Sequence, residues 1–212
     1  MAGSDHPAAA ACLSLDATVS VEDIVARIES EELSYVFVGE RHASGPVKRF
    51  AVELTNALVD RGHDVGLYVE GFRAGCMPHD AACRSLAGKF NARAFVALLR
   101  EVRAPVHGID PPEHDGRVPR MAATIAAGPE AVRVVLVGRA HVVDAGNPDA
   151  QLWVYGGGMR YPDPGDLVEA FPRERSLTLT LEPERGDSRP YALRADGCRA
   201  DYTLAAAATG DY

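Results

Sequence analysis

The sequence predicts an α/β fold, with a mainly parallel β-sheet flanked by helices in a single domain. Three observations lead to this class. The 212 residues, of which 47% are hydrophobic and 25% charged, match one ordinary soluble domain. Short apolar runs alternate with segments whose apolar residues recur at helical spacing. Strands that alternate with helices need crossover connections, and crossovers pair strands in parallel and place helices on the faces of the sheet.

The elements can be justified in chain order. The first predicted helix covers residues 21–31, with Ser20 as its N-cap and Asp23 as the acid of a capping box. The run 35–38 is too short and too rich in β-formers for a helix, so it predicts a buried strand. The same signals predict strands at 65–69, 105–109, 132–137, 152–155 and 177–181. They also predict a helix that follows Pro46 and ends near Gly62, one over 91–102, one that follows Pro112 and extends to Ala127, and a short one near 166–170.

No linker divides the chain, so we expect one α/β domain over residues 1–212, with a core at about 20–195 and frayed termini at 1–12 and 205–212. We also expect a cytoplasmic protein, since no basic residue precedes Arg27 and no apolar run reaches the ~18 residues of a membrane span. The four cysteines form no C-x-x-C pair, and we expect no disulfide among them.

The net charge of the chain indicates which classes of partner to expect. A net charge of -8 argues against nucleic acid as a partner, because nucleic-acid binders usually carry a basic face. We expect a small-molecule substrate, no nucleic acid and no membrane, and the sequence does not indicate an oligomeric state. Only Lys48 and Lys89 among the 22 basic residues are lysine, a bias typical of GC-rich genomes such as those of actinomycetes.

Ionisable residues follow four of the predicted strands. In a parallel sheet, ligands bind beyond the carboxyl ends of the strands, where the loops that follow neighbouring strands converge. The residues in question are Glu40, Arg41 and His42 after the first strand, Glu70 and Arg73 after the second, Asp110 after the third, and Arg139 and His141 after the fourth.

Two of these strand ends share the pattern G-x-x-H, as Gly39 to His42 and Gly138 to His141. In each, the glycine lets the backbone turn tightly out of the strand, so that the histidine can face the sheet edge. Two such turns predict two imidazoles at one pocket. The alternative is a structural ion network, in which the carboxylates only pair with neighbouring arginines; the pairs expected are Glu40 and Glu70 with Arg41, Arg73 or Arg139.

These motifs carry a resemblance to a known superfamily. The stretches Tyr35–His42, Leu67–Phe72 and Val134–His141 resemble the core of the erythromycin esterase-like, ChaN-like and Tiki/TraB superfamily, with similarity over about 34–181. The resemblance implies a minimal core of that α/β fold. Some members are metal-dependent peptidases, some hydrolyse a macrolide lactone, and some bind haem. Carried over by position, the implied catalytic residues are Glu40, His42, Glu70 and His141.

The residue types fit acid/base chemistry. An imidazole with a pKa near its ordinary value of ~6.5 can take a proton from water, and a carboxylate can orient it or act as the base itself. Guanidinium groups can hold an anionic group of the substrate. The three glycines at 156–158 have no side chain, so they would let the main chain come close to a bound ligand. The candidate substrate-binding residues are Arg41, Arg73, Asp110, Arg139, Arg160 and Tyr161.

Three function classes remain open. The favoured one is a hydrolase of an ester or amide, which either needs no cofactor or uses a divalent metal held by His42, Glu70 and His141. No G-x-S-x-G motif points to a serine nucleophile. The second is a biosynthetic lyase or cyclase that expels an anionic leaving group. The third is a haem-binding module.

Overall fold

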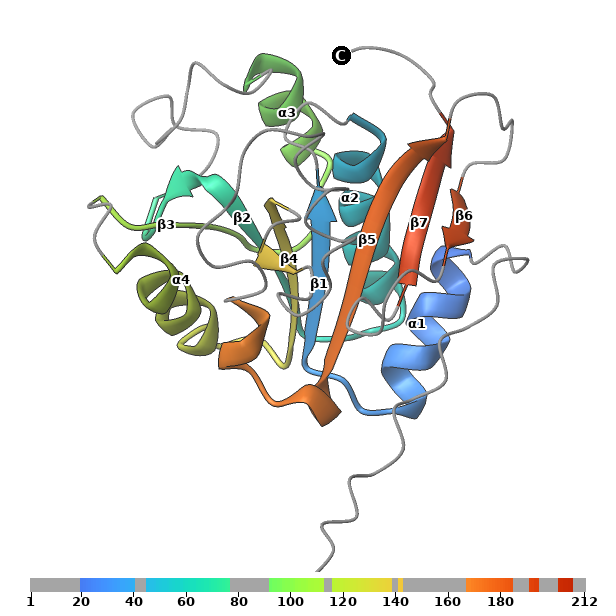
Figure 1. The fold of residues 1–212 in the computed structure, drawn as a ribbon, viewed down its shortest axis with the longest axis horizontal. Coiled ribbons are helices and arrows are strands. Elements are labelled where there is room, and N and C mark those ends of the chain that lie inside the picture. Colours follow the sequence, from blue (N-terminus) through green and yellow to red (C-terminus); the bar gives the residue numbers. More distant parts are fainter. Residues whose placement is uncertain are drawn as a thin grey trace, which may run out of the picture.

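The computed structural model describes residues 20–40, 45–76, 92–112, 116–138, 141–142, 167–184, 191–194 and 202–207. Within these ranges the strands form one seven-stranded sheet in the order β3-β2-β4-β1-β5-β7-β6 (Figure 1). Every neighbouring pair is parallel except β6 and β7, which are antiparallel. The predicted α/β class with a mainly parallel sheet is therefore confirmed. The strands are β1 (Tyr35–Glu40), β2 (Val65–Arg73), β3 (Val106–Asp110), β4 (Val132–Gly138), β5 (Ser176–Glu184), β6 (Tyr191–Arg194) and β7 (Tyr202–Ala207).

The helices begin and end close to the predicted positions. Helix α1 carries the expected capping box, in which the Ser20 hydroxyl accepts a hydrogen bond from the Asp23 N–H and the Asp23 carboxylate accepts one from the Ser20 N–H. The short helix predicted near 166–170 is a 3-10 helix over Val168–Ala170. The α-helices are α1 (Val21–Ser30), α2 (Gly45–Asp60), α3 (Ala92–Leu99) and α4 (Arg117–Ala126), and a second 3-10 helix covers Arg173–Arg175.

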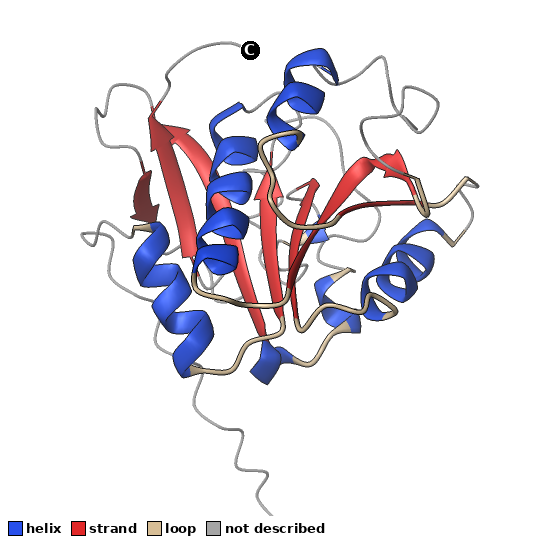
Figure 2. Cartoon of the chain, turned by 180° about the vertical axis from the view of Figure 1, so that it is seen from behind, coloured by secondary structure: helices blue, strands red, loops and turns tan. Residues whose placement is uncertain are grey.

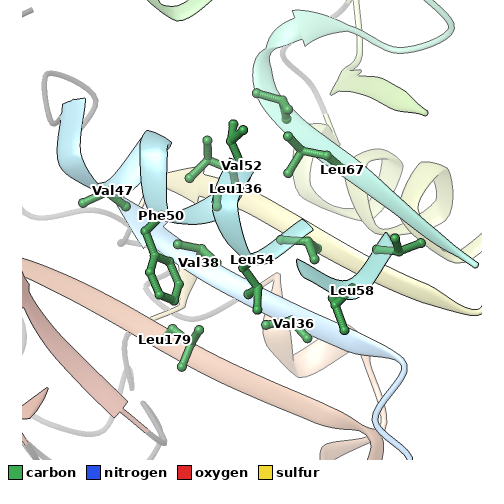
Figure 3. Packing of buried hydrophobic residues seen from close by; sticks show 14 of the residues in the cluster. Val36, Val38, Val47, Phe50, Val52, Leu54, Leu58, Leu67, Leu136 and Leu179 are labelled. Carbon is green, nitrogen blue, oxygen red and sulfur yellow. The ribbon is translucent and has the colours of Figure 1, made fainter. Parts of the chain in front are cut away.

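Helices cover both faces of the sheet. Helices α1, α2 and α3 pack on one face, which Figure 2 shows toward the viewer, and α4 packs on the other. Successive strand residues point to opposite faces, so Val36 and Val38 of β1 join the α2 side while Phe37 joins the α4 side. Figure 3 shows the α2 side, where apolar residues of the helix pack against β1, β2, β4 and β5. The central strands are thus buried from both sides.

Three features differ from the predictions or lie outside the described residues. Strands β6 and β7 were not predicted, and residues 205–207, expected in a frayed end, pair with β5 and β6 as part of β7. The strand predicted at 152–155 and the terminus predicted at 1–12 lie outside the described residues. No described helix is both long enough and apolar enough to cross a membrane.

The expectation of no disulfide was wrong. Cys76, just beyond β2, is disulfide-bonded, and its partner lies outside the described residues. The sequence argument rested on the absence of a C-x-x-C pair, but a disulfide needs only two cysteines that the fold brings within about 4–7 Å at their Cα atoms. Separation along the chain does not exclude such an approach.

Candidate functional site

The carboxyl ends of β1, β2 and β4 lie at one edge of the sheet. In the parallel register, Glu40 of β1 pairs with Gly138 of β4, and Val69 of β2 pairs with Leu136. Glu40, the last residue of β1, and Glu70, which follows Val69 in β2, therefore lie on the two strands that flank β4. The prediction that the strand-end acids share one edge follows from this register.

Glu70 is fixed by a local turn of β2. The register between β2 and β3 shifts after Val69, and Gly71 has a φ of 93°, a left-handed conformation that side chains with a Cβ rarely adopt. The Glu70 side chain is 4% exposed. Its Oε2 accepts a hydrogen bond from the Gly138 N–H at 2.5 Å, and its Oε1 lies 2.6 Å from Arg117 Nη2. Both carboxylate oxygens are thus held by donors.

Asp110 shares the same arginine. Its Oδ1 lies 2.6 Å from Arg117 Nη2, and its Oδ2 accepts a hydrogen bond from the Gly71 N–H at 2.9 Å. Burial lowers the pKa of Arg117, but the charges and hydrogen bonds of Glu70 and Asp110 outweigh burial, so the pKa lies above its ordinary value. Arg117 is therefore a permanent cation between two buried carboxylates.

His141 lies beside this group. It follows β4 and is 2% exposed. Its Nε2 lies 3.5 Å from Arg117 Nη1 and 3.7 Å from Glu70 Oε1. The arginine only donates hydrogen bonds and so faces an unprotonated Nε2, whereas the carboxylate only accepts them and so favours a protonated Nε2. Each protonation state of the imidazole therefore has a neighbour that suits it.

Glu40 has a different partner on the other face of the sheet. Its Oε2 lies 2.7 Å from Lys48 Nζ, and the two side chains are 4% and 7% exposed. Lys48 is the fourth residue of α2, and its ammonium lies 5.1 Å from the centre of the Phe95 ring. The edge thus holds two buried carboxylate–cation groups, one built with α2 and one with α4.

Of the other predicted site residues, the structure describes only Arg73. Arg73 is exposed at the end of β2, although its backbone pairs with Asp110. Among the described residues, the cations that pair with Glu40 and Glu70 are Lys48 and Arg117. The predicted site residues that lie outside the described residues are Arg41, His42, Arg139, Arg160 and Tyr161.

Sequence reasoning missed Lys48 and Arg117. Lys48 carried a usable signal, because a lysine is rare in this arginine-rich chain and falls on the helix that follows β1. Arg117 carried none in the sequence, since only the docking of α4 brings it to Glu70.

The predicted metal set is only partly described. His42 lies outside the described residues, and no three His, Cys, Asp or Glu side chains of the described part are placed to hold a metal. Glu70, the carboxylate of that set, has Arg117 on one oxygen and the Gly138 N–H on the other.

The described groups can transfer a proton and hold negative charge. An imidazole can take up and release a proton near neutral pH, and Glu70 Oε1 lies 3.7 Å from His141 Nε2. The Arg117 side chain is 21% exposed. An imidazole, a carboxylate and a guanidinium that lie close together are groups that an acid/base site with an adjacent anion-binding residue would use.

Comparisons with known proteins give distant structural likenesses. No protein-family model matches the chain, and no curated protein matches it significantly in sequence. The fold is similar to the structure "Cofacial heme binding to ChaN of Campylobacter jejuni", with a TM-score of 0.49, 11% identity, and coverage of 89% of this chain and 92% of that chain.

Two bacterial effectors are similar in the same way. The structure of the type III effector HopBA1 has a TM-score of 0.48 and 16% identity, with coverage of 88% of this chain and 93% of that chain. RRSP, a MARTX toxin effector domain from Vibrio vulnificus, has a TM-score of 0.39 and 16% identity, with coverage of 58% and 31%. A ChaN structure is thus among the matches. TM-scores below 0.5 carry no function to this chain, so its chemistry has to be argued from its own residues.

Proposed function

We propose that this chain is a small-molecule-processing enzyme with an acid/base site, and that it hydrolyses an ester or amide. The single observation that carries the proposal is the placement of His141, buried beside the ion pair of Glu70 and Arg117. In this proposal Glu40, His42 and Glu70 complete the catalytic group. Arg41, Arg73, Asp110, Arg139, Arg160 and Tyr161 contact the substrate in the same proposal.

His141 serves as the proton carrier. As the oxygen of a water bonds to the substrate carbonyl carbon, the imidazole takes one proton from that water, and Glu70 stabilises the resulting imidazolium across 3.7 Å. When the bond to the leaving group breaks, the same proton passes to the leaving oxygen or nitrogen. Arg117 holds the developing negative charge or an anionic group of the substrate.

Glu70 acts through its neighbours in this scheme. Both of its oxygens already accept hydrogen bonds, from Arg117 and Gly138, so it orients and compensates charge instead of taking the substrate proton. Glu70→Gln should keep its fold contact with Gly138 while removing the charge that favours imidazolium. The pH profile of activity should therefore shift, which a purely structural role would not produce.

A substrate screen tests the proposal. Wild type, His141→Asn and the control His63→Asn are assayed on a panel of chromogenic esters, lactones and amides. His63 contacts Glu29 at 3.0 Å, away from the sheet edge. We expect His141→Asn to lower kcat/KM by about 10²-fold or more, as the loss of a general base does, and His63→Asn to leave it unchanged. Full activity of a folded His141→Asn sample would refute the proposal.

The two alternatives give different products. A hydrolase adds the mass of one water to its substrate, whereas a lyase or cyclase releases an anionic leaving group without taking up water. A haem-binding module would instead show a Soret band that saturates on titration with haem. Mass spectrometry and absorption of the same samples therefore separate the three classes.

Compartment and partners belong to the proposal as well. We propose a small-molecule partner and no nucleic acid or membrane partner. We also propose a cytoplasmic location, although Cys76 is disulfide-bonded and disulfides persist mainly in oxidising compartments. Cell fractionation tests the location: recovery of the protein outside the cytoplasm would refute it.

A further inference from the structure

We propose that Arg117 is the built-in cation of this site and occupies the position at which a divalent metal ion would otherwise join Glu70 and Asp110. The inference concerns the cation alone, so it does not depend on whether the chain is a hydrolase. Its consequence is that the chemistry at Glu70 runs with a fixed guanidinium in place of an exchangeable metal.

The first argument is the bridging geometry. A single nitrogen, Arg117 Nη2, lies 2.6 Å from Glu70 Oε1 and 2.6 Å from Asp110 Oδ1. The two oxygens are therefore no more than twice that distance apart, with the positive charge between them. A zinc ion holds carboxylate oxygens at roughly 2.0–2.2 Å, so each oxygen would have to move by only roughly 0.5 Å toward the position of this nitrogen to bind a metal there.

The second argument is that the carboxylates are positioned without help from Arg117. Glu70 Oε2 accepts a hydrogen bond from the Gly138 N–H, and Asp110 Oδ2 accepts one from the Gly71 N–H. Both donors belong to the backbone of the sheet edge, and Gly71 is held in its left-handed turn. Backbone donors of this kind orient metal-binding carboxylates in other proteins. Truncation of Arg117 would leave two oriented acceptors facing one space.

The third argument is the nearby imidazole. His141 Nε2 lies 3.7 Å from Glu70 Oε1, whereas donor atoms around a tetrahedral zinc are roughly 3.3 Å apart. Two carboxylates and one imidazole are a ligand set that divalent transition metals accept. With the arginine present, no three such side chains of the described residues are placed to hold a metal.

The fourth argument is electrostatic. The Glu70 and Asp110 side chains are 4% and 3% exposed, and two buried carboxylates are costly without a cation. Arg117 provides one positive charge that does not titrate in the physiological range, since the carboxylates hold its pKa above its ordinary value against the effect of burial. A divalent ion would compensate both carboxylates and would also recruit His141, whereas the arginine leaves that imidazole to transfer protons.

Metal titration of arginine variants tests the inference. Tag-free wild type, Arg117→Ala, Arg117→Gln and the control Arg120→Ala, on the same helix, are titrated with Co²⁺ and followed by absorption and calorimetry. We expect Arg117→Ala to bind one equivalent of Co²⁺ about tenfold or more tightly than wild type and Arg120→Ala do. The double variant R117A/E70Q should lose the gain, because it removes the charged ligand.

The outcomes are decisive in both directions. If Arg117→Ala is unfolded without metal, recovery of its circular dichroism spectrum on addition of Co²⁺ supports the inference. If Co²⁺ does not restore it, Arg117→Gln, which keeps amide donors for the carboxylates, decides. A folded arginine variant that gains no metal, or a gain that Glu70→Gln leaves intact, would overturn the inference. Glu70-dependent metal binding by wild type would overturn it too. None of these results depends on enzymatic activity, so they are separate from the test of the proposed function.

Discussion

Replacing Lys48 by methionine should destabilise the protein strongly. Methionine keeps an apolar stem near Phe95 but removes the cation that lies 2.7 Å from Glu40. Because the Glu40 side chain is 4% exposed, its charge would remain buried without the lysine. Removal of one partner from a buried pair costs about 3–5 kcal/mol. For a chain of this size, that corresponds to a fall in Tm of roughly 6–20 °C.

The double variant K48M/E40L separates the charge effect from packing. Leucine at position 40 removes the stranded carboxylate, and an apolar replacement of a buried ion pair is often neutral or stabilising. The double variant should therefore be more stable than Lys48→Met alone. Urea unfolding followed by circular dichroism gives the four free energies of this cycle. Asp60→Asn is the matched control, since it breaks an ion pair with Arg103 that lies on the surface, and it should change stability little.

Two results would refute the reasoning. If Lys48→Met costs less than about 1 kcal/mol, the range of exposed pairs, the Glu40 carboxylate is not held buried against this lysine. If the losses of Lys48→Met and Glu40→Leu simply add in the double variant, the two side chains are not energetically coupled.

Three further predictions concern other parts of the fold. The Tyr68 hydroxyl donates a hydrogen bond to Glu130, and His107 Nε2 lies 2.7 Å from the same carboxylate. These hydrogen bonds outweigh the effect of burial and hold the pKa of Glu130 below its ordinary value of 4.5. The ionised form thus stabilises the fold above that pH and its contribution is lost as the pH falls, so Glu130→Gln should show a smaller loss of Tm than wild type between about pH 5 and 3; equal losses would contradict this. Under denaturing conditions without reductant, no more than two of the four cysteines should react with Ellman's reagent, because Cys76 and its partner are oxidised; four reactive thiols would exclude the disulfide. Leu54→Ala should lower the free energy of unfolding by about 2–5 kcal/mol, since Leu54 is fully buried between α2 and the sheet; a loss under 1 kcal/mol would mean that α2 does not pack there.

The parts of the fold that local interactions determine were predictable. The capping box of Ser20 and Asp23 spans three residues, and the sequence shows it directly. The buried parallel strands were predictable as well, because short continuous apolar runs between helices are typical of strands that are covered on both faces. Strand β7 lacked such a signal. Its alanines, at 205–207, resemble a frayed end, and their pairing with β5 is a long-range contact that no local pattern records.

The candidate site divides in the same way. The edge shared by Glu40, Glu70, Asp110 and His141 could be predicted, because the carboxyl ends of parallel strands meet by topology. The cations that pair with these acids were not predicted, because the partner of a strand-end acid depends on how a helix docks on the sheet. Arginines close to the acids in the sequence were the predicted partners. Arg73, however, is exposed, and among the described residues it is Arg117 that pairs with Glu70.

The positions of the two cations, Arg117 and Lys48, are explained by the carboxylates with which they pair. Arg117 is the first residue of α4 and Lys48 the fourth of α2, positions near a helix N-terminus where the helix dipole disfavours positive charge. The compensating charge comes from the sheet, since Glu70 and Glu40 lie 2.6 Å and 2.7 Å away. Because α2 and α4 pack on opposite faces, each layer of the fold contributes one cation to the same edge. The position of each charge then depends on the packing of its own helix, and a core substitution beneath α2 or α4 should disturb its own charged group while it leaves the other in place.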